Sequence, residues 1–156
     1  ALVQEVEKFG KVFITSEGPL EKEFEKYRIR DSPEKIHHLL SYATLYVGEG
    51  ATMAVESAIL GTPSIYISTL AGTMGNFSEL EKKYGLLFNY SDSESALAKT
   101  IELLKDSELK KTWDVKRAAL LRDKINVTEF MVKLIENFPD KKSGFSLSSV
   151  SDESYA

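Results

Sequence analysis

The stretch LYVGEGATMAVESAILGTPSIYIS, residues 45–68, most constrains how this chain folds. A short apolar run ends at Gly48-Glu-Gly50, an amphipathic segment follows, and Gly61-Thr-Pro63 separates that segment from a second apolar run. Short apolar runs bounded by glycine or proline are typical of buried strands, and the segment between them is typical of a helix. The stretch therefore predicts one parallel strand–helix–strand unit with a turn at the end of its first strand.

The same alternation of strand and helix extends over most of the chain. It predicts an α/β fold, namely a doubly wound, Rossmann-like or flavodoxin-like, parallel five-stranded sheet in three α/β/α layers with C-terminal helices. The expected strand order is 2-1-3-4-5, with the third strand central. We expect strands at residues 11–15, 27–30, 44–47, 64–67 and 86–88, and helices at 2–9, 33–42, 52–60, 78–84, 92–105, 107–122 and 127–138.

Composition sets the broad class of protein. The 156 residues are 42% hydrophobic and 28% charged, as in a soluble domain with its own core. The net charge of −4, without a basic stripe, argues against a nucleic-acid partner. No apolar run approaches the roughly 18 residues of a membrane span and no export signal opens the chain, so we expect a cytoplasmic protein. Serine-rich residues 140–156 predict a flexible tail after a domain of residues 1–139.

The sequence offers little to bind a metal or a cofactor. It contains no cysteine, and the adjacent His37 and His38 would point about 100° apart on a helix. No Ser-His-Asp, P-loop or metal-ligand pattern is present, and the acidic pairs do not separate a general acid from a general base. We therefore expect no metal and no cofactor, and the sequence leaves the catalytic residues unidentified.

The turn at Gly48-Glu-Gly50 lies at the carboxyl end of an expected strand, where open parallel sheets bind their ligands. Its glycines allow a positive φ and a close approach of the ligand, and the following helix begins with free N–H groups for an anion. Thr52 and Glu56 share one helix face, so a hydroxyl and a carboxylate could meet a phosphate and a ribose diol. Glu49 opposes this interpretation because its carboxylate would repel a phosphate. A turn with a purely structural role remains the alternative.

Residues 32–68, SPEKIHHLLSYATLYVGEGATMAVESAILGTPSIYIS, resemble an uncharacterised archaeal family that looks like the glycosyltransferase B-fold and is similar to UDP-N-acetylglucosamine 2-epimerases. The resemblance spans residues 1–105 and is most specific at 44–67. In such glycosyltransferases a glycine-rich turn of the C-terminal half meets the diphosphate, and a glutamate six residues after a turn glycine holds the ribose. The resemblance therefore implies that a UDP-sugar binds at Gly48, Glu49, Gly50, Ala51, Thr52, Met53 and Glu56.

Secondary candidates come from the same resemblance. His37 lies on the helix that precedes the turn and can flank the nucleotide base, although a surface or interface position is the alternative. The loop of residues 68–77 follows the next strand and could close over the sugar, or simply connect two elements. The candidates in this loop are Gly72, Thr73, Gly75 and Asn76. On the next helix, Glu79 lies where related transferases sometimes carry a donor-sugar contact.

These features predict the nucleotide-sugar-binding half of a glycosyltransferase or a sugar-nucleotide epimerase, inactive alone. The helical pattern that begins at residue 2 without an initiator methionine indicates a fragment, whose missing N-terminal half would complete the cleft. The alternative is a non-catalytic Rossmann-like module that mediates interaction or assembly. The sugar, the acceptor, the choice between transfer and epimerisation, and the formation of a homo-oligomer stay open.

Overall fold

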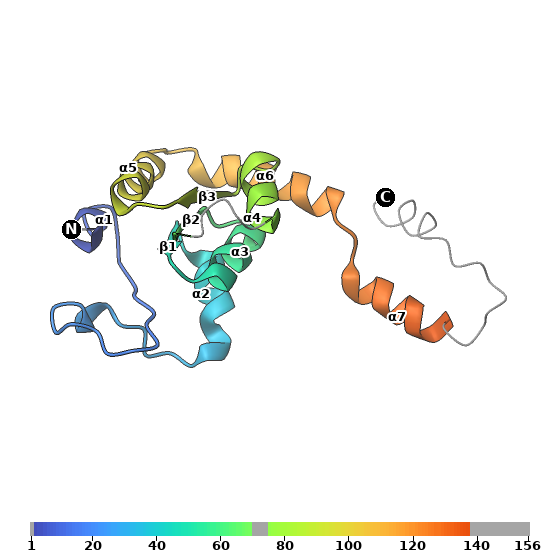
Figure 1. Ribbon diagram of the computed structural model, residues 1–156, viewed down its shortest axis with the longest axis horizontal. Coiled ribbons are helices and arrows are strands. Elements are labelled where there is room, and N and C mark those ends of the chain that lie inside the picture. Colours follow the sequence, from blue (N-terminus) through green and yellow to red (C-terminus); the bar gives the residue numbers. More distant parts are fainter. Residues whose placement is uncertain (1, 70–74, 138–156) are drawn as a thin grey trace. The chain divides into compact units, whose positions relative to one another are not determined.

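The computed structural model describes residues 2–69 and 75–137 (Figure 1). The chain forms two compact units, residues 1–117 and residues 118–156. Within the described residues the elements are α1 (Leu2–Val6), the 3-10 helices η1 (Glu25–Tyr27) and η2 (Pro33–Lys35), α2 (Ile36–Tyr42), β1 (Tyr46–Gly48), α3 (Ala51–Leu60), β2 (Ser64–Ile67), α4 (Gly75–Lys82), β3 (Leu87–Tyr90), α5 (Ser93–Leu104), α6 (Leu109–Asp123) and α7 (Val127–Asn137).

The first unit is built on a parallel sheet of three strands in the order β1-β2-β3. Ile65 at the centre of β2 lies opposite Val47 of β1 and Phe88 of β3. Helix α3 packs against all three strands and also contacts α2 and α4, whereas α5 packs against β2, β3 and α1. Figure 1 shows α1 and α5 on one side of the strands and α2 and α3 on the other. The α/β class with parallel strands agrees with the sequence.

The prediction of a five-stranded sheet with strand 44–47 at its centre is wrong. The expected strands at residues 11–15 and 27–30 form only an isolated parallel bridge, in which the Ile14 N–H donates to Tyr27 O (2.8 Å) and the Ile29 N–H to Ile14 O (3.0 Å). Neither segment pairs with β1 in the described chain, so β1 is an edge strand. The physical reason is burial: Phe13 is 49% exposed, and a lone strand pair without a covered face is only marginally stable.

The core lies between α3, the sheet and α6. Ile65, Leu86 and Leu87 are fully buried, and the small Ala54 and Ala58 of α3 are buried as well, which lets that helix lie close to the strands. Trp113 of α6 is buried and its indole Nε1–H donates to Leu86 O (3.2 Å). Trp113 therefore packs in the core of the first unit.

Helix α6 also binds the chain just before β2 and β3. Gly61 ends α3 with φ +92° and Gly85 follows α4 with φ +61°, conformations that favour glycine. The Arg117 Nε–H donates to Ile59 O (2.9 Å) in the last turn of α3, and Lys116 Nζ donates to Gly85 O (2.9 Å). Two consecutive cations thus meet carbonyl groups at two helix ends, where positive charge is favourable.

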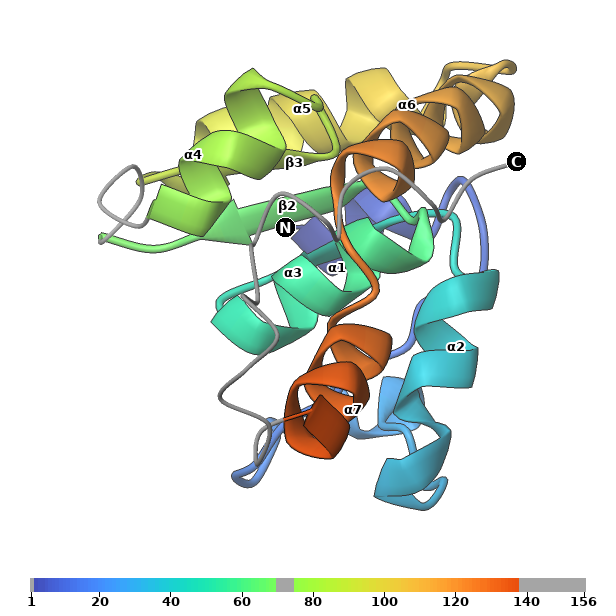
Figure 2. The same ribbon diagram turned by 90° about the vertical axis from the view of Figure 1, so that its right-hand side faces the viewer.

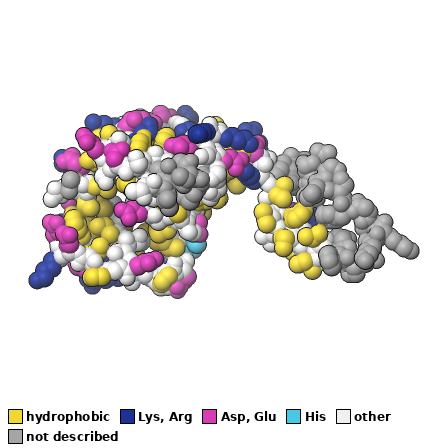
Figure 3. Space-filling view, in the orientation of Figure 1, with side chains coloured by type: hydrophobic (Ala, Val, Ile, Leu, Met, Phe, Trp, Pro, Cys, Tyr) yellow, Lys and Arg dark blue, Asp and Glu magenta, His cyan; other side chains and the backbone are white. Residues whose placement is uncertain are grey.

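The second unit contains the last turn of α6 and helix α7. The Glu129 N–H donates to Asn126 Oδ1 (3.2 Å), which caps the start of α7. Figure 3 shows hydrophobic side chains on the surface of α7. The exposed ones are Val127, Met131, Val132 and Ile135. The tail at residues 140–156 lies outside the described residues.

Candidate functional site

The turn between β1 and α3 lies at the carboxyl edge of the sheet, as the sequence predicts. Gly48 is the last residue of β1, and Gly50 precedes the first residue of α3 with φ −74° and ψ 99°. Gly50, the residue before α3, has no side chain that could cap the helix, and the first turn contains no acidic residue. The free N–H groups of a helix N-terminus attract an anion. The geometry of the backbone is therefore compatible with a phosphate at this turn.

The two glycines of the turn have a structural role that the sequence analysis missed. Among the described residues, positive φ occurs at Gly61 and Gly85, so the turn glycines do not adopt the positive φ that glycine allows. A Cβ atom at Gly48 would lie 2.8 Å from the Tyr46 hydroxyl oxygen, and one at Gly50 would lie 3.0 Å from it. That hydroxyl donates to Gly50 O (3.2 Å), and burial raises the pKa of Tyr46. The glycines make room for a tyrosine side chain beneath the turn.

The other turn candidates differ in their exposure. Glu49 and Thr52 are exposed, whereas Ala51 and Met53 are half-buried. The Thr15 hydroxyl lies 3.9 Å from Met53 Sδ, so the N-terminal segment of the chain reaches the first turn of α3. Only the tertiary fold brings Thr15 here, and the sequence carries no signal for it. Glu49 and Thr52 are the turn side chains that solvent, and therefore a ligand, reaches most easily.

Two of the predicted residues, His37 and Glu56, are in direct contact. His37 Nε2 lies 3.2 Å from Glu56 Oε2, with the imidazole 56% exposed and the carboxylate side chain 36% exposed. The contact joins α2 to α3, which pack against each other and lie side by side in Figure 2. The sequence indicates each residue separately, but the pair arises from the packing of the two helices.

The remaining candidates are less informative. Gly75 and Asn76 begin helix α4 and are exposed, so the expected loop of residues 68–77 is wrong at its C-terminal end. Glu79 is half-buried on the same helix. Gly72 and Thr73 lie outside the described residues. The described chain therefore supports a site only at the Gly48–Glu56 segment and at His37.

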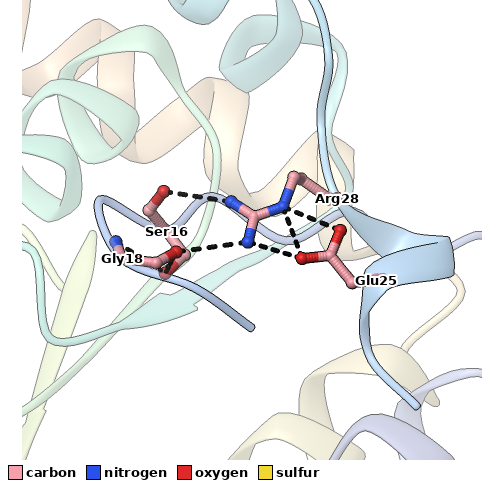
Figure 4. Close-up of polar contacts among 4 residues, drawn as sticks. All are labelled: Ser16, Gly18, Glu25 and Arg28. Atoms are coloured by element: carbon pink, nitrogen blue, oxygen red, sulfur yellow. Dashed lines mark hydrogen bonds and ion pairs between the residues drawn. The ribbon is translucent and has the colours of Figure 1, made fainter. Parts of the chain in front are cut away.

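A hollow of about 340 Å³ lies elsewhere in the first unit, and its polar wall is occupied by internal hydrogen bonds. The Arg28 guanidinium donates to both oxygens of Glu25 (2.8–3.1 Å), to Gly18 O (3.2 Å) and to Ser16 O (3.4 Å), as Figure 4 shows. This hydrogen bonding lowers the pKa of Glu25. Arg28 therefore joins the segment of Ser16 and Gly18 to Glu25. None of the candidate site residues lines the hollow. Its lining is Phe13, Glu25, Lys26, Arg28, Ile29, Arg30, Asp31 and Leu39.

The described residues contain neither a candidate metal site nor a helix that could span a membrane. No group of three or more His, Asp or Glu side chains in residues 2–69 and 75–137 could hold a metal ion. Over the same ranges, every helix is too short or too polar to cross a bilayer.

The chain matches no protein-family model, and neither the curated proteins nor the solved structures contain a significant match to it. The resemblance to the glycosyltransferase B-fold therefore stays a prediction.

Proposed function

We propose that this chain is a nucleotide-sugar-binding domain and that it holds the diphosphate and ribose of a UDP-sugar at the Gly48–Glu56 segment. The single observation that carries the proposal is the uncapped N-terminus of α3 at the carboxyl edge of a parallel sheet. Its parent protein would be a glycosyltransferase or a sugar-nucleotide epimerase, and this chain alone would catalyse nothing.

The proposed binding is electrostatic. The first N–H groups of α3 and the positive end of the helix dipole attract the diphosphate, and the exposed Thr52 hydroxyl lies in the same turn. Glu56 lies one turn further on the same helix face, where its carboxylate can accept hydrogen bonds from the ribose. A hydrogen bond to a charged group contributes about 1.5–3 kcal/mol in favourable geometry. Glu49 works against the diphosphate because it is exposed and negatively charged.

The second candidate function is a non-catalytic module for interaction or assembly. It is favoured by the exposed apolar side chains of α7 and by the structural explanation that Tyr46 gives for both turn glycines. In this case the turn binds no ligand and the sheet only carries the helices.

Titration of UDP separates the two functions. We expect millimolar UDP to shift the amide resonances of residues 50–53 in the wild-type chain. Glu56→Gln keeps the shape but weakens the acceptor, so affinity falls by about tenfold, or 1.4 kcal/mol. Glu49→Ser removes a repulsive charge and should raise the affinity. Calorimetry and chemical-shift mapping measure these changes.

The matched control is Glu108→Gln, which removes the same charge from an exposed carboxylate that pairs with Lys111 (3.4 Å). Its affinity for UDP should equal that of the wild type. An absence of shifts around Gly48–Glu56 at millimolar UDP would reject the binding site and leave the interaction module.

A further inference from the structure

We infer that His37 is a positioning residue for Glu56. His37 holds one oxygen of the Glu56 carboxylate and leaves the other oxygen to accept a hydrogen bond from a ribose hydroxyl. The inference rests on the proposed function, and it concerns discrimination between ribose and deoxyribose at that site. His37 contacts Oε2 at 3.2 Å, and Oε1 has no partner among the described residues. Each carboxylate oxygen carries two lone pairs, so Oε1 keeps its full capacity for a ligand.

The imidazole can act in this way because the helix that carries it is fixed. Leu40 of α2 is buried, and the buried Thr62 hydroxyl donates to Leu40 O (2.6 Å). The same hydroxyl also lies 3.4 Å from Ala43 O, just after the helix end. These contacts tie the C-terminal part of α2 to Thr62, two residues before β2. The position of His37 therefore follows from the core and not from its own exposed side chain.

The contact restricts a side chain that would otherwise be mobile. Glutamate has three rotatable side-chain bonds and loses rotamer entropy when a ligand immobilises it. A carboxylate that is already held by His37 loses less of this entropy on binding, which is the general effect of preorganisation. Nε2 and Oε2 form an ion pair when the imidazole is protonated, and this charge–charge contact holds the carboxylate. Losing His37 should therefore weaken the ribose contact without touching the diphosphate.

The test compares UDP with 2′-deoxy-UDP by calorimetry. We expect the wild-type chain to prefer UDP by about tenfold, the effect of one hydrogen bond to a carboxylate. In His37→Ala the preference should fall to about threefold or less because Glu56 is no longer held. His37→Lys should restore part of it, since an ammonium group also attracts the carboxylate.

The neighbouring His38 provides the matched control. It is exposed on the same helix, and no contact with Glu56 is present. His38→Ala removes the same ring and should leave the preference for UDP unchanged. In the double variant His37→Ala/Glu56→Gln the preference should be no lower than in Glu56→Gln alone, because both changes remove one coupled unit.

The outcomes separate this inference from the proposed function. If no variant and not even the wild type binds UDP, the proposed function fails and the inference fails with it. If the wild type prefers UDP while His37→Ala keeps the whole preference, binding stands and the positioning role is rejected. Equal losses in His37→Ala and His38→Ala would also reject it, because a general effect on α2 explains them. If His37→Ala does not fold, as its melting curve would reveal, His37→Gln carries the comparison.

Discussion

Tyr46 gives the Gly48-Glu-Gly50 turn a physical explanation that requires no ligand. Its ring and hydroxyl occupy the space that a Cβ atom at either glycine would need, and its hydroxyl donates to Gly50 O (3.2 Å). A glycine-rich turn at a strand end therefore indicates close packing, and only the chemistry beside the turn indicates function. In this chain that chemistry is the free start of α3 and the Glu56 carboxylate.

Gly48→Ala should destabilise the first unit by about 1–3 kcal/mol, because the new methyl group would lie 2.8 Å from the Tyr46 hydroxyl oxygen. Tyr46→Phe removes that oxygen and its hydrogen bond at a cost of about 0.5–1.5 kcal/mol. In the double variant the contact with the oxygen is gone and the nearest ring atom, Cζ, lies 3.2 Å from the new methyl group, so the loss should be smaller than the sum of the two single losses. Denaturant unfolding of the four chains gives this coupling directly. Additive losses would show that the tyrosine does not explain the glycine.

Sequence reasoning at this scale identified residues but not their contacts. Glu56 was predicted from its spacing to Gly50, and His37 from its place on the preceding helix. Their contact depends on how α2 packs on α3, which no local pattern encodes. The contact of Tyr46 with the turn glycines could not be predicted from the sequence. Alternation along a strand indicates only which face of the sheet the Tyr46 side chain lies on. Its contact with the turn depends on the path of the backbone after Gly48.

Among the elements, α5 shows how one side chain sets a helix boundary. Asp92 precedes the helix, and its Oδ1 accepts from the Ser95 N–H at 2.7 Å. This hydrogen bond from the backbone holds the pKa of Asp92 below its usual value. A carboxylate with a depressed pKa stabilises the folded state above its unfolded pKa of about 3.9. That contribution disappears as the pH falls through the lower pKa of the folded state.

Asp92→Asn should therefore be less sensitive to acid than the wild type. Asparagine also caps helices but carries no charge that a proton can remove. We expect the melting temperature of the wild type to exceed that of Asp92→Asn near neutral pH and the difference to shrink below about pH 4. Thermal unfolding of both chains between neutral and acid pH measures it. A difference that stays constant over this range would contradict the role of the ionised cap.

The elements that the sequence predicts well are those with strong local signals. The strand at residues 64–67 has the predicted bounds, and α3 begins one residue before its predicted start, because glycine and proline mark both boundaries. Residues 11–15 have an apolar composition typical of a strand, but a strand also needs a partner of sufficient length. In the described chain this segment finds one bridge to Arg28, and the sheet stops at β1.

On the scale of the whole molecule, the two units differ in the burial of their apolar side chains. The first unit contains the sheet and a buried core, whereas α7 of the second exposes four large apolar residues. Exposed apolar surface of this kind favours association between chains. A chain that ends after Lys124 lacks α7 and should keep the melting transition of the first unit, because the sheet and its helices remain complete.

The same truncation should reduce association at high protein concentration. Sedimentation velocity over a concentration series measures it. The matched variant Met131→Glu/Ile135→Lys keeps the chain length and places charges at two exposed apolar positions. It should sediment like the truncated chain. If both altered chains associate as strongly as the wild type, α7 is not the surface responsible.

The contacts of α6 also bear on the kinds of sequence change that this fold tolerates. Trp113, Lys116 and Arg117 donate to carbonyl groups of three different residues, all from little more than one helical turn. Replacing Lys116 or Arg117 removes one hydrogen bond to a carbonyl group, whereas replacing the buried Trp113 also leaves a cavity in the core. One residue inserted between Trp113 and Lys116 would instead rotate the following side chains by about 100° and move them by about 1.5 Å. Homologous chains should therefore keep the length of this turn of α6 constant even where Lys116 or Arg117 is replaced by another residue.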